Sequence, residues 1–172
     1  MSVYESILRR RSIRTYLDKP LEYEKLKILL NAARWAPSAR NLQPWHLIIV
    51  LDGKLKERLV NACRRQRFVG EASAIIVGLA DMELSPKWAV VDTTIALEHV
   101  VLAACDLGLG TCWIGAFDEE AVKSLLNIPR RFKVVALLTV GYPAEKPSAR
   151  SRRPISQIYS INCYGSSFKP IK

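Results

Sequence analysis

The order of apolar and polar residues predicts helices and strands that alternate along the whole chain. Residues 22–36 place Leu26, Leu29, Leu30 and Ala33 on one helical face, and Pro37 ends the pattern. Other helical patterns cover residues 3–10, 54–66, about 87–107, and the run from Asp118 to Pro129. Apolar, β-branched runs predict strands at His46–Leu51, Ser73–Ala80, Thr111–Phe117 and Lys133–Tyr142, with a weak strand pattern at 155–162. This mixture predicts an α+β or α/β sandwich.

The helix expected at 87–107 is unusual because its second half, TTIALEHVVLAAC, is apolar nearly all round. A helix without a polar face is a buried helix. In a chain of this size, we expect another subunit to bury part of it. Residues 155–162 likewise have little to pack against nearby in the chain.

The composition is that of a globular protein. The 172 residues correspond to one domain, 1–172, with 49% apolar and 24% charged residues. The longest wholly apolar runs are too short to cross a membrane. The N-terminal segment carries a charge every few residues, unlike a secretory signal. We therefore expect a cytoplasmic protein without a membrane partner.

The charge balance favours an anionic partner. The chain has 26 Lys and Arg against 16 Asp and Glu, a net charge of +10. Such an excess fits a phosphorylated cofactor, a nucleic acid, a membrane surface, or merely a solvated basic surface. The segment Arg10-Arg-Ser-Ile-Arg14 combines three cations and a hydroxyl, which suits a phosphate as well as a solvated helix end.

No side-chain motif for covalent or metal catalysis is present. The four cysteines form no C-x-x-C pair, and His46 and His99 are the only histidines. The G-x-G at Gly108–Gly110 closes a helix before a strand, which is not the context of a dinucleotide fingerprint. We expect the cysteines to be packing residues, with Cys163 the most exposed, and His99 to lie in a core or interface. Any chemistry is expected to come from a bound cofactor.

Four segments occur in one order: RRRSIRTY, APSARNLQPWHLIIV, LGLGTCWIGAFDEE and SRRP. Together, over about residues 4–160, they resemble the nitroreductase family of FMN-dependent oxidoreductases. The resemblance implies an α+β sandwich with a mostly antiparallel central sheet flanked by helices. It also implies a homodimer with FMN at the subunit interface and a C-terminal segment exchanged with the partner subunit.

The resemblance assigns the first and last segments to the FMN phosphate and its surroundings. Arg10 and Ser12 resemble the residues that hold the phosphate and ribityl chain, and Arg11 lies between them. Arg14 resembles the cation beside the pyrimidine edge of the flavin. Arg150 and Arg152 match the C-terminal R-x-R-x-P loop, with Arg152 the better candidate for a phosphate contact.

The two middle segments are expected at the flavin ring. Pro37, Ser38 and Asn41 match a loop that reaches the flavin bound mainly by the other subunit, and Arg40 falls near the mouth of the substrate pocket. The strand end beside flavin N5 corresponds to Trp113, Ile114, Gly115 and Ala116. Some relatives have Glu where Gly115 stands, so backbone N–H groups are the expected contacts there. Gln66 resembles a polar contact to the ring.

The implied reaction is ping-pong electron transfer with no catalytic side chain. NADH or NADPH gives hydride to flavin N5, and an acceptor such as a nitroaromatic, quinone or flavin then takes the electrons. Larger relatives roof this site with inserted helices, whereas only Asp81–Lys87 fills the gap here, so we expect an open substrate side. This also argues against the specialised dehalogenases and flavin-consuming enzymes of the same fold, which rely on a lid.

A basic nucleic-acid-binding module without flavin is the remaining alternative. It needs aromatic residues interleaved with arginines on one surface. Trp35, Trp45 and Trp113 instead occupy core-like or motif positions. We therefore expect a small-molecule acceptor and no nucleic-acid partner.

Overall fold

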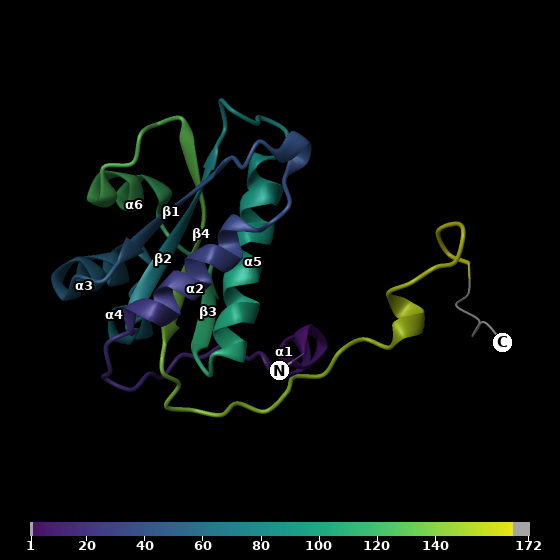
Figure 1. Ribbon diagram of the computed structural model, residues 1–172, viewed down its shortest axis with the longest axis horizontal. Coiled ribbons are helices and arrows are strands. Elements are labelled where there is room, and N and C mark those ends of the chain that lie inside the picture. The colour runs from purple at the N-terminus through teal and green to yellow at the C-terminus, as the bar shows by residue number, and fades with distance from the viewer. Residues whose placement is uncertain (1, 167–172) are drawn as a thin grey trace.

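A four-stranded antiparallel sheet forms the centre of the computed structural model, which describes residues 2–166 (Figure 1). Its strands are β1 (Trp45–Val50), β2 (Ala74–Asp81), β3 (Gly110–Ile114) and β4 (Phe132–Gly141), in the order β1-β2-β4-β3. The helices are α1 (Val3–Arg9), α2 (Tyr23–Arg34), α3 (Gly53–Ala62), α4 (Phe68–Glu71), α5 (Ala89–Asp106) and α6 (Glu119–Leu126), with 3₁₀ turns η1 (Ala39–Asn41) and η2 (Ile155–Gln157). The predicted α+β sandwich with an antiparallel sheet is confirmed.

Polar caps fix where several helices begin. The Ser2 side chain accepts a hydrogen bond from Glu5 N, and the Glu5 carboxylate accepts from Ser2 N, which forms a capping box at α1. The Asp52 carboxylate accepts from Leu55 N at the start of α3. The helix predicted from Asp118 begins with a cap, since Asp118 Oδ1 accepts from Ala121 N at 3.1 Å.

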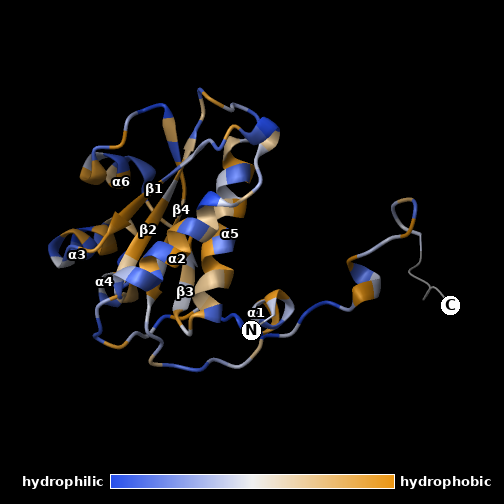
Figure 2. Ribbon diagram, viewed as in Figure 1, coloured by the Kyte–Doolittle hydropathy of each residue, from blue (hydrophilic) through white to orange (hydrophobic). Residues whose placement is uncertain are grey.

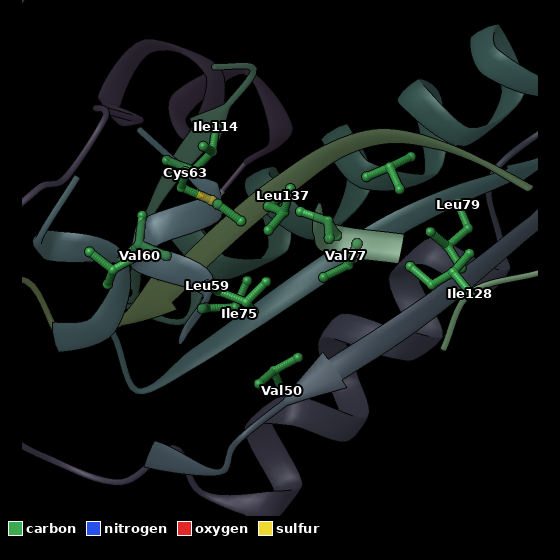
Figure 3. Close-up of a cluster of buried hydrophobic side chains, with 14 of the residues drawn as sticks. Val50, Leu59, Val60, Cys63, Ile75, Val77, Leu79, Ile114, Ile128 and Leu137 are labelled. Carbon is green, nitrogen blue, oxygen red and sulfur yellow. The ribbon is translucent and has the colours of Figure 1, made fainter. Parts of the chain in front are cut away.

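Helices cover both faces of the sheet. One apolar core lies between the sheet and α3, α4 and α6, and Figure 3 shows its side chains converging from β2, β4 and α3. The second core lies against α2 and α5. Gly78 on β2 lets α5 approach closely, because a Cβ there would lie 2.5 Å from Leu97 Cδ1.

The burial of α5 is one-sided. Ala96, Leu97, Val100 and Val101 are fully buried against the sheet and α2. On the other side, Val91 is 46% exposed, and other apolar residues of this side are only partly covered. Figure 2 shows apolar colour around much of this helix. Within one chain, α5 is thus buried on one side only, and the burial of its outer side by another subunit stays a prediction.

The N-terminal arginine segment is held along the edge of the sheet. Ile13 N donates to Thr111 O, and Leu17 N donates to Tyr142 O, both at 2.9 Å. Gly110 and Gly141 face each other on β3 and β4, and their missing Cβ atoms leave space for Ile13 and Tyr16. The Tyr16 hydroxyl donates to Ile13 O and lies 2.7 Å from Thr139 Oγ1. The segment that carries the first arginine cluster is thus fixed by buried contacts.

The C-terminal segment differs most from the sequence prediction. Residues 155–162 contain the turn η2 and no strand among the described residues, so the predicted strand is wrong for a single chain. Every residue from 151 to 160 is exposed, and the segment extends away from the sheet (Figure 1). A strand needs the backbone groups of a neighbouring strand, and no strand within residues 2–166 pairs with this segment.

Smaller differences concern boundaries and short elements. The helix predicted at 54–66 ends at Ala62, and the strand predicted at 111–117 ends at Ile114. The four-residue helix α4 was not predicted. Cys63 and Cys112 are buried as expected, but Cys163 is exposed and does not pack. Among residues 2–166, no helix has the length and apolar character that crossing a membrane requires.

Candidate cofactor site

A basic pocket joins the two ends of the chain. Its volume is about 350 Å³. The predicted residues that line it are Arg10, Arg11, Ser12, Arg14, Arg150 and Arg152. Glu145, Pro147 and Ser148 complete the lining. The structure therefore brings together both arginine clusters that the sequence placed about 140 positions apart.

Backbone pairing explains why these distant segments meet. Ser12 forms a parallel bridge with Thr111 at the start of β3, and Tyr16 forms an antiparallel bridge with Pro143 just after β4. Ala144 N donates to Thr15 O at 2.9 Å, and Arg14 N donates to the Glu145 carboxylate. The chain leaving β4 consequently runs beside the N-terminal segment before it reaches Arg150.

The arginines of this pocket have N–H donors that form no hydrogen bond or ion pair within residues 2–166 and can bind a ligand. None of the five forms an ion pair within the described part of the chain. Arg11 Nη1 donates to Leu8 O and Arg10 O, while its buried Nε has no partner among the described residues. Five guanidinium groups against one carboxylate give the pocket a positive charge. Such forked donors match the oxygens of a phosphate.

The end of β3 offers backbone groups rather than side chains. Gly115 and Ala116 are exposed, and a Cβ on Gly115 would meet nothing within 4 Å. Ile114 is 2% exposed and points into the core, so it can offer only its backbone. Trp113 Nε1 donates to Glu98 Oε2 at 3.3 Å, and its ring packs on the α2 and α5 side.

Gln66, which the resemblance assigns to the flavin ring, lies beside this strand end. Its side-chain amide donates to Cys63 O at 2.9 Å and to Ala116 O at 3.4 Å. It follows Arg64 and Arg65, which both have positive φ values. Arg14 is close to the same region, because its guanidinium carbon lies 5.9 Å from the centre of the Phe68 ring. The basic pocket, Gln66 and the end of β3 thus belong to one side of the molecule.

The predicted loop Pro37–Asn41 lies elsewhere in the chain's own fold. Ala39 N donates to Asp92 Oδ2 at 3.2 Å, which places the loop at the N-terminal end of α5. The basic pocket lies toward the opposite end, where Thr111 follows α5 (Figure 1). An 18-residue helix is about 27 Å long. One chain therefore does not bring Ser38, Arg40 and Asn41 to the arginine pocket.

The backbone of this loop is strained. Arg40, Asn41 and Gln43 have φ values of 53°, 56° and 51°, a region that costs a residue with a side chain about 1–2 kcal/mol. Within the loop, Gln43 N donates to Ser38 Oγ at 3.0 Å and Gln43 Nε2 donates to Asn41 O at 3.1 Å. The loop exposes Arg40 and Asn41 to solvent.

The buried thiols are not nucleophiles at neutral pH. Burial raises the pKa of Cys63 to about 11, and burial also raises the pKa values of Cys105 and Cys112. Their thiols therefore stay protonated, whereas the thiolate is the reactive form. His99 Nδ1 lies 3.2 Å from Ala32 O and is half-buried, as expected for a core or interface histidine. No cluster of metal ligands occurs among residues 2–166.

The sequence analysis missed two carboxylates that organise the site. The Glu145 carboxylate accepts a hydrogen bond from the backbone amide of Arg14, and the Asp92 carboxylate accepts one from that of Ala39. Neither lies in a motif used above, and each meets its partner only through the tertiary fold. The one available signal for Asp92 was a charged residue early in an otherwise apolar helix.

Comparisons with known proteins show the family of the chain. The family model described as "Nitroreductase family" matches residues 7–82 and 62–142. The chain belongs to the nitroreductase family. Nitroreductases that resemble it include an Archaeoglobus fulgidus protein with the provisional name NADH dehydrogenase/NAD(P)H nitroreductase. The two are 38% identical over 148 residues, which is 81% of this chain and 84% of the relative.

Solved structures of this family match nearly the whole chain. A Parabacteroides distasonis protein with the same provisional name superposes with a TM-score of 0.87 at 31% identity, covering 94% of this chain and 98% of the other. The NADPH:FMN oxidoreductase of Vibrio harveyi, solved with NAD⁺, gives a TM-score of 0.88 at 26% identity. Here the matched part is 94% of this chain and 77% of the Vibrio protein. As a member of the nitroreductase family, this protein is an oxidoreductase.

The donor set of the pocket fits FMN. A terminal phosphate suits five guanidinium groups, a serine hydroxyl and the spare Arg11 Nε donor. A flat ring suits the open space at Gly115 beside exposed backbone at Ala116. The negative charge of Glu145 repels a bound phosphate, but its carboxylate already accepts a hydrogen bond from Arg14 N.

Proposed function

We propose that this nitroreductase-family protein is an FMN-dependent NAD(P)H oxidoreductase that reduces a small acceptor such as a nitroaromatic, a quinone or a flavin. The observation that carries the proposal is the convergence of five arginines from both ends of the chain on one pocket. The Vibrio harveyi structure is named an NADPH:FMN oxidoreductase, and a Bacillus subtilis relative with 30% identity is named FMN reductase [NAD(P)H]. These names support the same chemistry here.

The chain's residues bind and orient the cofactor in this proposal. Arg10, Arg11, Ser12, Arg150 and Arg152 hold the phosphate and ribityl chain, with Arg152 and Arg10 the main phosphate contacts. Bound FMN supplies hydride acceptance and donation at its N5. Gly115 and Ala116 would offer backbone groups to that atom, and Gln66 and Arg14 would contact the ring. The side chains transfer no electrons themselves.

A homodimer completes this site. The loop that contains Pro37, Ser38 and Asn41 lies at the other end of α5 from the arginine pocket. The loop that contacts each flavin therefore comes from a second copy of the chain. Apolar side chains on α1 and on the C-terminal segment are also exposed, including Tyr4 at 69% and Tyr159 at 58%. We propose that the partner covers them and that the C-terminal segments are exchanged.

The acceptor side of the proposed site is open. Only seven residues, 82–88, connect β2 to α5, and Asp81 Oδ1 ties them into a turn by accepting from Glu83 N and Leu84 N. A turn of this size cannot form a helical roof. Large quinones and free flavins are therefore proposed acceptors alongside nitroaromatics, with Arg40 near the pocket mouth. A cytoplasmic location is part of the same proposal.

The phosphate contacts can be tested by FMN titration of the apoprotein. Arg10→Ala and Arg152→Ala each remove a charge-assisted donor, and we expect the FMN dissociation constant to rise by about one to two decades. Arg153→Ala is the matched control, because Arg153 is an exposed neighbour that does not line the pocket. Riboflavin lacks the phosphate, so its binding should change little. Unchanged FMN affinity in both variants contradicts the phosphate assignment.

A further inference from the structure

Asp92 is a buried carboxylate that the proposed electron transfer does not use. It lies in the first turn of α5 and is 4% exposed. The first turn of a helix favours a carboxylate, because the peptide dipoles point their positive ends toward it. Within residues 2–166, Asp92 forms no ion pair with a cationic side chain. Its Oδ2 instead accepts the Ala39 amide at 3.2 Å.

The segment that Asp92 holds is the strained loop after α2. Three of the four residues from Arg40 to Gln43 have left-handed backbone angles. The other hydrogen bonds of residues 38–43 run within the segment, such as Asn41 N to Ser38 O at 3.0 Å. Among the described residues, Asp92 supplies the one side-chain hydrogen bond that reaches this segment from another element.

We infer that Asp92 is a positioning residue for the flavin-facing loop: its carboxylate fixes Ala39 and thereby orients Ser38 and Asn41 toward the FMN of the partner subunit. The inference rests on the proposed function, which assigns this loop to the flavin. Asp92 belongs to α5, the helix that also packs on the sheet through Leu97. The hydrogen bond therefore connects the loop to a helix that packs closely on the sheet.

Two substitutions separate the hydrogen bond from the packing. Asp92→Asn keeps the shape and an acceptor oxygen, whereas Asp92→Leu keeps the same branched arrangement of side-chain heavy atoms, in a larger side chain, without an acceptor. Thr93→Val is the matched control, because Thr93 is the next residue, is fully buried, and bonds to Leu79 O at 3.4 Å instead of the loop. The Thr93→Val variant shows how the loss of a buried polar contact in α5 that does not involve the loop affects the protein.

The first readout is amide hydrogen exchange in FMN-loaded protein. In Asp92→Leu we expect exchange of the residue 39–43 amides to rise about tenfold or more, as for the loss of one charge-assisted hydrogen bond. Asp92→Asn should stay within about threefold of wild type, since the acceptor remains. Thr93→Val should leave these amides unchanged. Equal exchange profiles for Asp92→Leu and Thr93→Val overturn the inference.

The second readout is the FMN dissociation constant together with the rate of flavin reduction. Asp92→Leu should weaken FMN binding or slow reduction by about tenfold, and Asp92→Asn should restore most of it. A loosened loop with wild-type binding and reduction contradicts the positioning role. Failure of the proposed function is a different result: the wild-type protein itself would then bind no FMN.

Discussion

At the residue scale, Arg14 differs from the other arginines of the basic pocket. It is exposed, and its backbone is fixed by the Glu145 carboxylate while its guanidinium lies over the Phe68 ring. Arg10 and Arg11 are half-buried beside the proposed phosphate position. Arg14 is thus suited to act on the ring rather than on the phosphate. Its charge matters once negative charge develops at the pyrimidine edge.

Substitution Arg14→Gln removes this charge and keeps most of the stem and a donor. A unit charge near the ring in a partly solvated site is worth about 1–2 kcal/mol. We expect a flavin midpoint potential lower by about 20–40 mV and reduction by NAD(P)H slower by about tenfold, with FMN still bound. Arg153→Gln is the control. Potentiometry and stopped-flow reduction that match wild type would show that Arg14 does not face the ring.

Residue types and order were enough to predict the arginine pocket but not its carboxylates. Arg10, Ser12 and Arg152 stand in recognisable motifs, and Gln66, whose contact with the flavin ring stays a prediction, donates a hydrogen bond to Ala116 O. Glu145 and Asp92 accept hydrogen bonds from backbone amides. Every residue type except proline has such an amide, so the sequence does not show which amide will bond to a given carboxylate. The roles of these two carboxylates depend on which loops the fold places beside them.

At the element scale, the pattern of apolar and polar residues predicted the long helices and strands. It did not predict elements whose structure depends on contacts with other segments. α2 follows from the helical spacing of its apolar residues over 12 positions, and β4 from a ten-residue sequence that is apolar apart from Lys133, Thr139 and Gly141. α4 is only four residues long, too short for a helical period to show. The C-terminal segment has strand-like residues, yet Ile155 and Ile158 remain exposed because no strand of the same chain lies beside them.

Deletion of residues 155–172 tests the role of that segment. If the partner subunit pairs with it, its loss uncovers apolar surface on both copies, and we expect monomers or aggregates with little bound FMN. Light scattering coupled to size exclusion measures the change. As a control, substituting the exposed Tyr164 by Ser within the full chain should preserve the assembly. A truncated protein that remains a flavin-loaded dimer contradicts segment exchange.

At the scale of the whole molecule, the fold separates the two halves of the proposed site. The arginine pocket and the Ser38–Asn41 loop lie toward opposite ends of α5, while the outer side of α5 and the residues of α1 leave apolar surface uncovered. A second copy would supply the missing half of each site and bury that surface. The sequence indicated this through a helix too apolar for a single small domain.

The proposed function requires that the arginine pocket bind FMN and that NAD(P)H reduce this FMN. The most direct test is the visible absorbance of the purified, FMN-reconstituted protein during anaerobic titration with NADH and NADPH, with Arg10→Ala/Arg152→Ala double-variant protein alongside. We predict a protein-bound flavin spectrum that bleaches stoichiometrically with one of the two donors and returns when a quinone is added. A colourless protein after reconstitution and desalting, or a bound flavin that neither donor bleaches, would contradict the account.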